Sequence, residues 1–314
     1  YGTGEGVRAE VSWTHRNLIR PEGAVTVRGV AGTQEQYVGA ALRQSNFRRR
    51  DQILNGRFTL QNTSRRAFDA RTIELAGGIE RQTNIIWQKK WTWSAGAELV
   101  ATRERDFRRA AGGGNRTFLI ASLPATLGYD GSNDLLDPTR GFRLSGRIAP
   151  EISEQGGVST YVRAQLDASA YFPATERITL AGRVRLASIA GADIRAIAPS
   201  RRLYSGGGGS VRGYGFQRIG PLDLFRDPTG GRSLVEFAAE ARIRVGVFGI
   251  VPFVDAGNVY LSELPGFDGL RFGAGVGGRY HSSFGPIRID LGTPLNRRAG
   301  DPRLTVAVSL GQAF

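Results

Sequence analysis

The side chains that could carry out acid–base chemistry in this chain are two histidines and several carboxylates. His15 and His281 lie in turns at predicted strand ends, and neither has a nucleophile or a group of metal ligands at a recognisable spacing. The chain has no cysteine, which excludes a disulfide framework and a thiolate metal site. Catalysis, a cofactor and a metal therefore find no support, and carboxylates such as Glu236, Glu240 and Asp290 are expected to pair with arginines.

A glycine-rich segment contains the most distinctive group of residues. Gly206 to Gly209 lack the following lysine and the strand-to-helix context of a phosphate cradle, so a turn or hinge is the better interpretation. The run Val211-Arg212-Gly213-Tyr214 comes directly afterwards. A guanidinium binds carboxylates with two parallel hydrogen bonds and can hold a loop that would not order by itself. From chemistry alone, a tight turn with a solvated arginine is the open alternative.

The positive charge of the chain is almost all arginine. There are 42 basic residues against 28 acidic ones, a formal net charge of +14, and the only lysines are Lys89 and Lys90. A nucleic-acid footprint gathers basic residues on one stripe, whereas these arginines are spread along the chain and often alternate with apolar residues. Nucleic-acid binding is therefore disfavoured. The polar lumen of a barrel, or phosphate groups of lipids and lipopolysaccharide, fits the charge better.

The elements that must position these residues have a period of two, which predicts β-strands. In 233–246, Glu236, Glu240, Arg242 and Arg244 share one face and apolar residues form the other. A lipid-facing arginine costs about 2–4 kcal/mol, so exposing all four charges to lipid would cost roughly 5–10 kcal/mol. These charges are therefore expected to face the lumen of a membrane barrel.

Fifteen such segments can be counted, and the opening YGTGEG is interpreted as the end of one more. Most run to ten or more residues, enough to cross an apolar band of about 25 Å, whereas strands of soluble sandwiches average about 5–6. Since single-chain bacterial barrels have even strand numbers, the fold is predicted to be an all-β, antiparallel transmembrane β-barrel of about sixteen strands, the first largely missing from the chain. The predicted strands lie near 6–14, 24–32, 35–46, 51–63, 67–81, 90–103, 116–129, 141–152, 157–172, 177–190, 233–246, 249–260, 269–281, 286–294 and 303–314.

The connections fall into two alternating classes. Short periplasmic turns are predicted at 47–51, 173–177 and 246–249, and the longest outside loop spans about 191–232, a length that is usually functional or disordered. The turn that holds Asp137 to Gly141 is expected to be structural, with the aspartate as a cap. Apolar strand faces often end in an aromatic residue, as in the girdles of membrane barrels: Trp13, Tyr129, Phe142, Phe172, Tyr260, Tyr280 and Phe314.

At the Val211–Tyr214 run, the chain resembles the TamA/BamA-type outer-membrane assembly factors of the bacterial surface antigen superfamily. The resemblance continues through SLVEFAAEARI, VPFVDAGNVY, FGPIRIDLGTPLNRR and the final LTVAVSLGQAF, and it covers 1–314 as one barrel domain. EVSWTHRNL and LLDPTRGFRLSG are similar to the TamA branch. The resemblance implies that the long loop folds into the barrel and that Arg212 contacts Glu240 and Asp255 on its wall.

The resemblance also implies a function in the outer membrane of a Gram-negative bacterium. The chain would be the outer-membrane component of a translocation and assembly module, helping to insert or secrete autotransporters and other outer-membrane proteins through a seam between its first and last strands. Gly311 would help the last strand bend, or is simply a small lumen-facing residue. Phe314 resembles the C-terminal aromatic signal of outer-membrane proteins, and can equally be an interface anchor.

The implied partners are client outer-membrane proteins, lipid and lipopolysaccharide, and a TamB-like protein anchored in the inner membrane. That last partner would bind through POTRA domains that precede the barrel and are absent from this chain. The alternatives are a BamA-like insertase, a two-partner secretion transporter, a passive porin-like channel, and a soluble lectin-like β protein. A porin would show steady conductance and would not need Arg212, whereas a lectin would be soluble without detergent.

Overall fold

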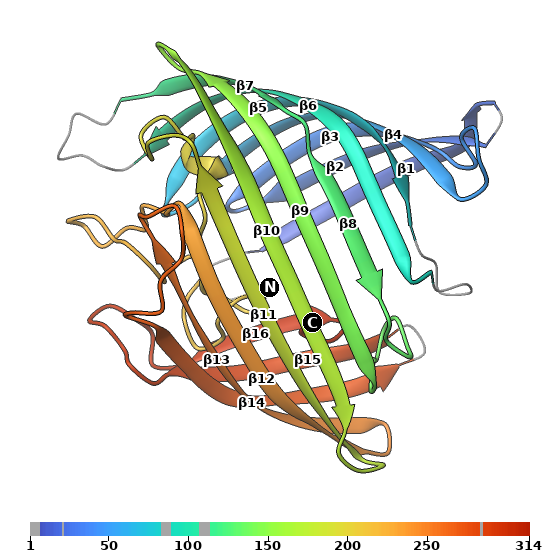
Figure 1. Ribbon diagram of the computed structural model, residues 1–314, viewed down its shortest axis with the longest axis vertical. Helices are drawn as coiled ribbons and strands as arrows, with labels where there is room; N and C mark the ends of the chain where they lie inside the picture. The colour runs from blue at the N-terminus through green and yellow to red at the C-terminus, as the bar shows by residue number, and fades with distance from the viewer. Residues whose placement is uncertain (1–6, 21, 83–88, 107–113, 283–284) are drawn as a thin grey trace.

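The structure, a computed structural model, is one antiparallel sheet of sixteen strands that curls into a barrel (Figure 1). It describes residues 7–20, 22–82, 89–106, 114–282 and 285–314. A short 3₁₀ helix, η2 (Pro199–Arg201), lies between β11 and β12, and no helix in these described ranges is long and apolar enough to cross a membrane. The strands are β1 (Arg8–Ile19), β2 (Gly23–Gly32), β3 (Glu35–Gln44), β4 (Gln52–Ser64), β5 (Phe68–Arg81), β6 (Trp91–Asp106), β7 (Arg116–Ser122), β8 (Ala125–Asp130), β9 (Gly141–Glu154), β10 (Val158–Pro173), β11 (Ile178–Ala190), β12 (Ser233–Val245), β13 (Phe248–Tyr260), β14 (Arg271–Ser282), β15 (Gly285–Pro294) and β16 (Thr305–Leu310).

The predicted fold class and strand number are confirmed, but the sixteenth strand comes from an unexpected place. The predicted strand 116–129 is divided at Leu123 and Pro124 into β7 and β8, which both pair with β6 on one side and β9 on the other. A proline cannot donate a ladder hydrogen bond, which explains the break. The further strand expected at YGTGEG falls on residues 1–6, outside the described residues.

The two strands at the edges of the sheet, β1 and β16, run in the same direction. Because β7 and β8 share one position, the sixteen strands occupy fifteen positions around the sheet. Neighbours are antiparallel throughout, so the first and fifteenth positions, β1 and β16, run in the same direction. Within the described residues β1 pairs only with β2, and β16 only with β15. One strand antiparallel to both edges would complete the alternation.

The distribution of side chains is inverted relative to a soluble domain. Large apolar side chains on the outer face are exposed, and many charged side chains on the inner face are buried. This is the arrangement of a barrel with lipid outside and a polar interior. Three of the charges predicted to face the lumen, Glu236, Glu240 and Arg242, are buried, whereas Arg244 at the strand end is half exposed. Exposed outer residues include Val11, Val38, Leu75, Leu99, Ile152, Leu166, Ile250, Val276 and Ile289.

Aromatic side chains gather at one end of the barrel, opposite the long loop. Trp91, Tyr129 and Phe142 form a row on β6, β8 and β9, with ring centroids 5.0 and 5.2 Å apart. Phe248 and Tyr280 form a second contact at 5.7 Å on β13 and β14. Rings with an apolar body and a polar tip suit the boundary between lipid and water, so this end of the barrel carries an interfacial girdle.

Candidate functional site: a loop clamped inside the barrel

Arg212 lies inside the barrel and contacts three carboxylates. Its Nε and Nη2 donate to the two oxygens of Asp255 at 2.7 and 2.8 Å, and its backbone N–H donates to the same group at 2.9 Å. Nη1 donates to Glu240 at 3.0 Å and lies 3.7 Å from Asp290. The guanidinium carbon is 3.6 Å from the centroid of the Phe253 ring. The structure therefore brings together the three residues that the resemblance had paired.

Strand register explains why these carboxylates converge. On the inner face, Glu240 of β12 stands opposite Phe253 of β13, and Asp255 is the next inward residue along β13. Asp290 comes from β15 and is itself bound by Arg279 at 2.6 Å. Asp290 was predicted to pair with an arginine, but only the structure shows that it also lies beside Arg212. The group formed by Arg212, Glu240, Asp255 and Asp290 is called the clamp below. Phe253 was missed, although its inward position follows from the same alternation as Asp255.

The electrostatics of the clamp keep Arg212 charged. Burial alone would lower its pKa, but the hydrogen bonds and negative charge of Asp255, Glu240 and Asp290 outweigh burial and raise the pKa above the ordinary arginine value. The side chains of Arg212, Glu240 and Asp255 are almost entirely buried. A buried pair of this kind is stable only while every partner is present, because an unpaired buried charge is costly.

Glycines allow the loop backbone to approach the barrel wall. Gly213 has φ +99°, a conformation that suits glycine, and its N–H donates to Thr305 Oγ1 at 3.1 Å. A Cβ on Gly292 would lie 2.7 Å from the Gly213 nitrogen, and one on Gly273 would collide with the carbonyl oxygen of Arg212. Glycines on β14 and β15 therefore leave the space in which the motif backbone lies against the barrel wall.

The Gly273→Ala substitution should loosen the loop without changing any charge. Overpacking a fitted site typically costs about 1–3 kcal/mol, and we expect trypsin to cleave the loop arginines at least severalfold faster in this variant. Gly278→Ala is the matched control, since Gly278 lies on the same strand with no atom within 4 Å of its added Cβ. Equal cleavage rates for the two variants would show that close contact at Gly273 does not hold the loop.

The remaining motif residues pack within the loop. Val211 and Tyr214 are fully buried and form an apolar cluster with Ile219. The Tyr214 hydroxyl donates to Asn296 at 2.8 Å, and burial raises the pKa of this phenol. The motif thus combines one charged clamp with a small core, so it is more than a tight turn with a solvated arginine.

A second carboxylate anchors the loop just before the motif. The Glu236 side chain on β12 accepts from Ser205 at 2.8 Å and from Ser210, and it forms an ion pair with Arg183 at 3.4 Å. Arg183 also donates to the carbonyl oxygens of Gly209 and Ser210. Glu236 was predicted to pair with arginine, whereas the serine contacts were not predicted.

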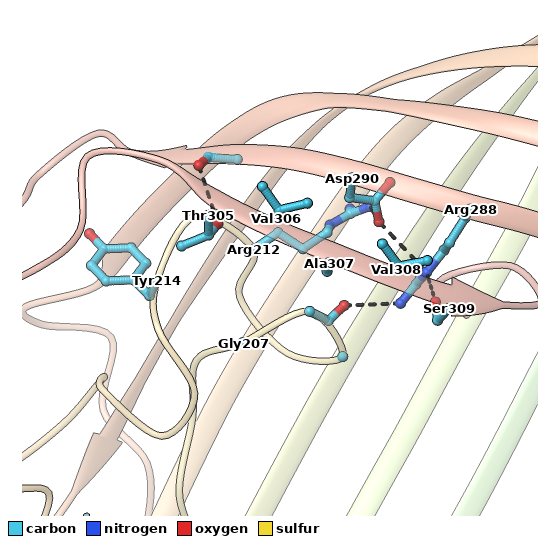
Figure 2. Close-up of a pocket in the computed structure, with 13 residues that line it drawn as sticks. Gly207, Arg212, Tyr214, Arg288, Asp290, Thr305, Val306, Ala307, Val308 and Ser309 are labelled. Atoms are coloured by element: carbon cyan, nitrogen blue, oxygen red, sulfur yellow. Dashed lines mark hydrogen bonds and ion pairs between the residues drawn. The ribbon is translucent and has the colours of Figure 1, made fainter. Parts of the chain in front are cut away.

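The loop tip packs against the inner face of the last strand and leaves a cavity of about 240 Å³ (Figure 2). The cavity is lined by residues 305–309 of β16, by Arg288 and Asp290 of β15, and by residues 207–209 of the loop. A Cβ on Gly208 would lie 2.6 Å from the Ala307 methyl group. The loop therefore supports β16 from the inside.

The hydrogen-bond pattern shows which backbone groups of β16 face β15. The Gly311 N–H donates to the Pro286 carbonyl at 2.7 Å, which makes 311 and 286 a hydrogen-bonded pair. Such pairs alternate in an antiparallel ladder, so Ala307 and Ser309 are also bonded to β15. The backbone N–H and C=O groups of Val308 consequently point away from β15.

The two predicted residues at the end of the chain lie beyond β16. Gly311 has φ +90°, and the strand ends at Leu310. The prediction that Phe314 continues the outward apolar face is wrong, because the chain turns inward at Gly311 and the Phe314 ring lies beside Arg183 and Arg242 of the lumen. An interface anchor is therefore excluded in this conformation.

Three polar residues differ in placement from the expectation. His15 and His281 lie within β1 and β14 and not in turns. Asp137 does not cap its own turn, since Asp134 accepts from the backbone of Leu136 and Asp137. Asp137 instead lies 3.6 Å from Arg244 of β12 and 3.3 Å from His281 of β14. In the described part of the chain, no group of three or more His, Asp or Glu side chains is placed to hold a metal.

The tilted strands, apolar exterior and arginine-clamped loop define an outer-membrane β-barrel of the kind found in Gram-negative bacteria. A family model described as the Omp85 superfamily domain matches residues 1–314. The chain belongs to the Omp85 superfamily. It is thus an outer-membrane barrel of a superfamily of protein insertases and secretion transporters.

Solved structures with the same fold include three outer-membrane proteins. BamA from Haemophilus ducreyi lacking POTRA domains 1–3 matches at TM-score 0.80 and 18% identity, over 98% of this chain and 68% of that one. CdiB from Acinetobacter baumannii matches at 0.64 and 13%, over 99% and 58%. CdiB from Escherichia coli matches at 0.60 and 14%, over 95% and 58%. The chain spans only about three fifths to two thirds of the length of these relatives.

Proposed function

We propose that this barrel is the outer-membrane component of a translocation and assembly module and that client strands enter at the seam between its first and last strands, along β16. The observation that carries the proposal is the packing of the clamped loop against the inner face of β16, the last strand of the sheet. A strand at the edge of a sheet is a template for backbone hydrogen bonding. The clamped loop would support β16 while a client strand pairs with it.

The chemistry of the edge suits a strand of an outer-membrane protein. Val308 is exposed on the outer face, whereas Thr305 and Ala307 face the lumen. A client strand that alternates apolar and polar residues would continue both faces when it pairs there. Since β1 and β16 run in the same direction, the added strand would be antiparallel to β16 and would restore the alternation of the sheet.

The choice of assembly module within the superfamily rests on two sequence segments. EVSWTHRNL at 10–18 and LLDPTRGFRLSG at 135–146 resemble the TamA branch. The clients would then be autotransporters and related barrels, and the partner a TamB-like protein bound through POTRA domains preceding the barrel. A BamA-like insertase would use the same edge with a broader set of clients.

Disulfide trapping of a client tests the proposal, since a chain without cysteine can carry a single introduced thiol. We expect Val308→Cys in the full-length protein to form an adduct with a client barrel that carries one cysteine in a terminal strand. Val254→Cys is the control, because Val254 is similarly exposed on the outer face but its strand β13 is paired on both sides.

Equal trapping at both positions, or assembly of the client without trapping at Val308, would overturn the proposal. A passive channel would give no adduct at either position and a steady conductance that the client does not change.

A further inference from the structure

Two arginines lie on the outer face of the barrel, although most charged side chains of the strands face the lumen. Arg71 of β5 stands directly opposite Arg103 of β6. By strand alternation, Arg71 shares its face with the exposed Ile73, and Arg103 shares its face with the exposed Leu99. Both arginines are exposed, and among the described residues neither has a hydrogen bond or an ion pair. Like charges directly opposite each other in a sheet are destabilising, so this pair indicates an anionic partner.

The arginine pair lies near the outer boundary of the apolar band. The start of β5 is at the end of the barrel that carries the long loop, since Phe68 packs against Tyr204 of that loop. The aromatic girdle at the other end includes Trp91, the first residue of β6. From Trp91 to Arg103 the strand rises about 40 Å, or roughly 28–33 Å of height at the tilt of a membrane barrel, against an apolar band of about 25 Å. Arg103 therefore reaches the level of the lipid head groups, where an outward arginine costs little.

Strand register extends the pair into two neighbouring rows on the outer face. The polar row crosses β3 to β7 through Gln36, Asn62, Arg71, Arg103 and Thr117. The apolar row, one step nearer to the centre of the membrane, crosses the same strands through Val38, Leu60, Ile73, Ala101 and Leu119. Apart from Leu119, the side chains of both rows line one groove of about 740 Å³. The groove therefore has a polar, basic end and an apolar end, as an acylated anion requires.

One carboxylate lies beside the pair, but it already has partners. Asp69 Oδ2 accepts from Arg105 at 2.9 Å, and Asp69 Oδ1 accepts from the Ser64 hydroxyl at 2.7 Å. Asp69 and Arg105 are opposite each other on the outer face, one step further from the apolar row. Three arginines thus stand against one carboxylate, which leaves a positive surface above the groove.

We propose that Arg71 and Arg103 bind the phosphate groups of lipid A, the acylated and phosphorylated glucosamine lipid of the outer leaflet, while its acyl chains lie in the groove below. A guanidinium binds phosphate with two parallel hydrogen bonds. The five strands of the rows span about 19 Å, a width that takes several acyl chains side by side and that a two-chain phospholipid fills only in part. The site uses none of the residues of the β16 edge, so it does not depend on the proposed client path.

Native mass spectrometry of the full-length protein in detergent, titrated with diphosphoryl lipid A, tests the basic end of the site. We expect Arg71→Gln/Arg103→Gln to bind this lipid about tenfold more weakly or worse, since two charge-assisted hydrogen-bonding groups are lost. Arg49→Gln/Arg50→Gln is the matched control, because it removes the same charge from exposed residues of the β3–β4 turn at the other end of the barrel, and its affinity should equal that of the wild type. Gel migration with and without boiling confirms that each variant is folded. Equal lipid A affinity in Arg71→Gln/Arg103→Gln and the wild type would overturn the proposal.

The choice of lipid separates lipid A from other sources of phosphate. Dephosphorylated lipid A should bind about tenfold more weakly than the diphosphoryl form, and its affinity should not change in Arg71→Gln/Arg103→Gln. Phosphatidylglycerol that binds as tightly as lipid A, or inorganic phosphate that displaces lipid A, would contradict the assignment.

An aromatic substitution tests the apolar end without changing any charge. Ala101→Phe fills the groove, and we expect a severalfold loss of lipid A affinity. Ala239→Phe is the control, because Ala239 is exposed on the outer face of β12 and does not line this groove. If the two variants bound lipid A equally well, the acyl chains would not lie in this groove and the proposal would fail.

Discussion

Arg212→Ala is expected to lower the free energy of unfolding by about 3–5 kcal/mol, the usual cost of removing one partner of a buried ion pair. The substitution leaves Asp255 and Glu240 buried on the wall without the guanidinium that binds both. We expect the unboiled protein to lose its compact gel migration at a lower urea concentration. Client assembly should fall by about tenfold or more, since 1.4 kcal/mol already corresponds to a factor of ten.

Companion variants identify the cause of that loss. Arg212→Ala/Asp255→Asn/Glu240→Gln removes the unpaired negative charges and should recover part of the stability. Arg57→Ala is the control, because Arg57 pairs with Glu74 on β4 and β5 but is half exposed, and an exposed pair contributes only about 0–1 kcal/mol. If Arg212→Ala behaved like Arg57→Ala in both assays, the clamp would have no role in stability or assembly.

Val308→Pro should strongly reduce client addition while the barrel remains folded. Proline removes one backbone N–H, and at Val308 that N–H points away from β15. Prolines are tolerated in edge strands when the N–H side is unpaired. We expect urea stability within about 0.5 kcal/mol of wild type, as for surface substitutions, with the client adduct and the rate of assembly reduced about tenfold or more.

Ala307→Pro is the matched control one residue earlier. Its N–H is bonded to Asp290 in the alternating ladder between β15 and β16, so this proline should destabilise the last strand itself. The pair of variants therefore separates edge recognition from strand stability. Normal client assembly by a folded Val308→Pro protein would exclude the β16 edge as the docking site.

Period-two alternation predicted most of the barrel because it depends only on the covalent geometry of a strand. Successive side chains point to opposite faces, so the inward positions of Glu236, Glu240 and Asp255 follow from residues that adjoin them in the chain. A break between two strands cannot be recognised from alternation when inward and outward residues continue to alternate across it. This is why 116–129 was predicted as one strand although Pro124 divides it.

Local patterns in the chain are sufficient to predict the fold class, the inward and outward faces within the strands, and the arginine motif of the long loop. Which inward groups meet depends on the folded barrel. The distance from Arg212 to Asp290, and the position of the Phe314 ring beside Arg183 and Arg242, depend on register across several strands and on the turn at Gly311. Residues far apart in the chain approach only when the sheet curls, and no local pattern encodes that curvature.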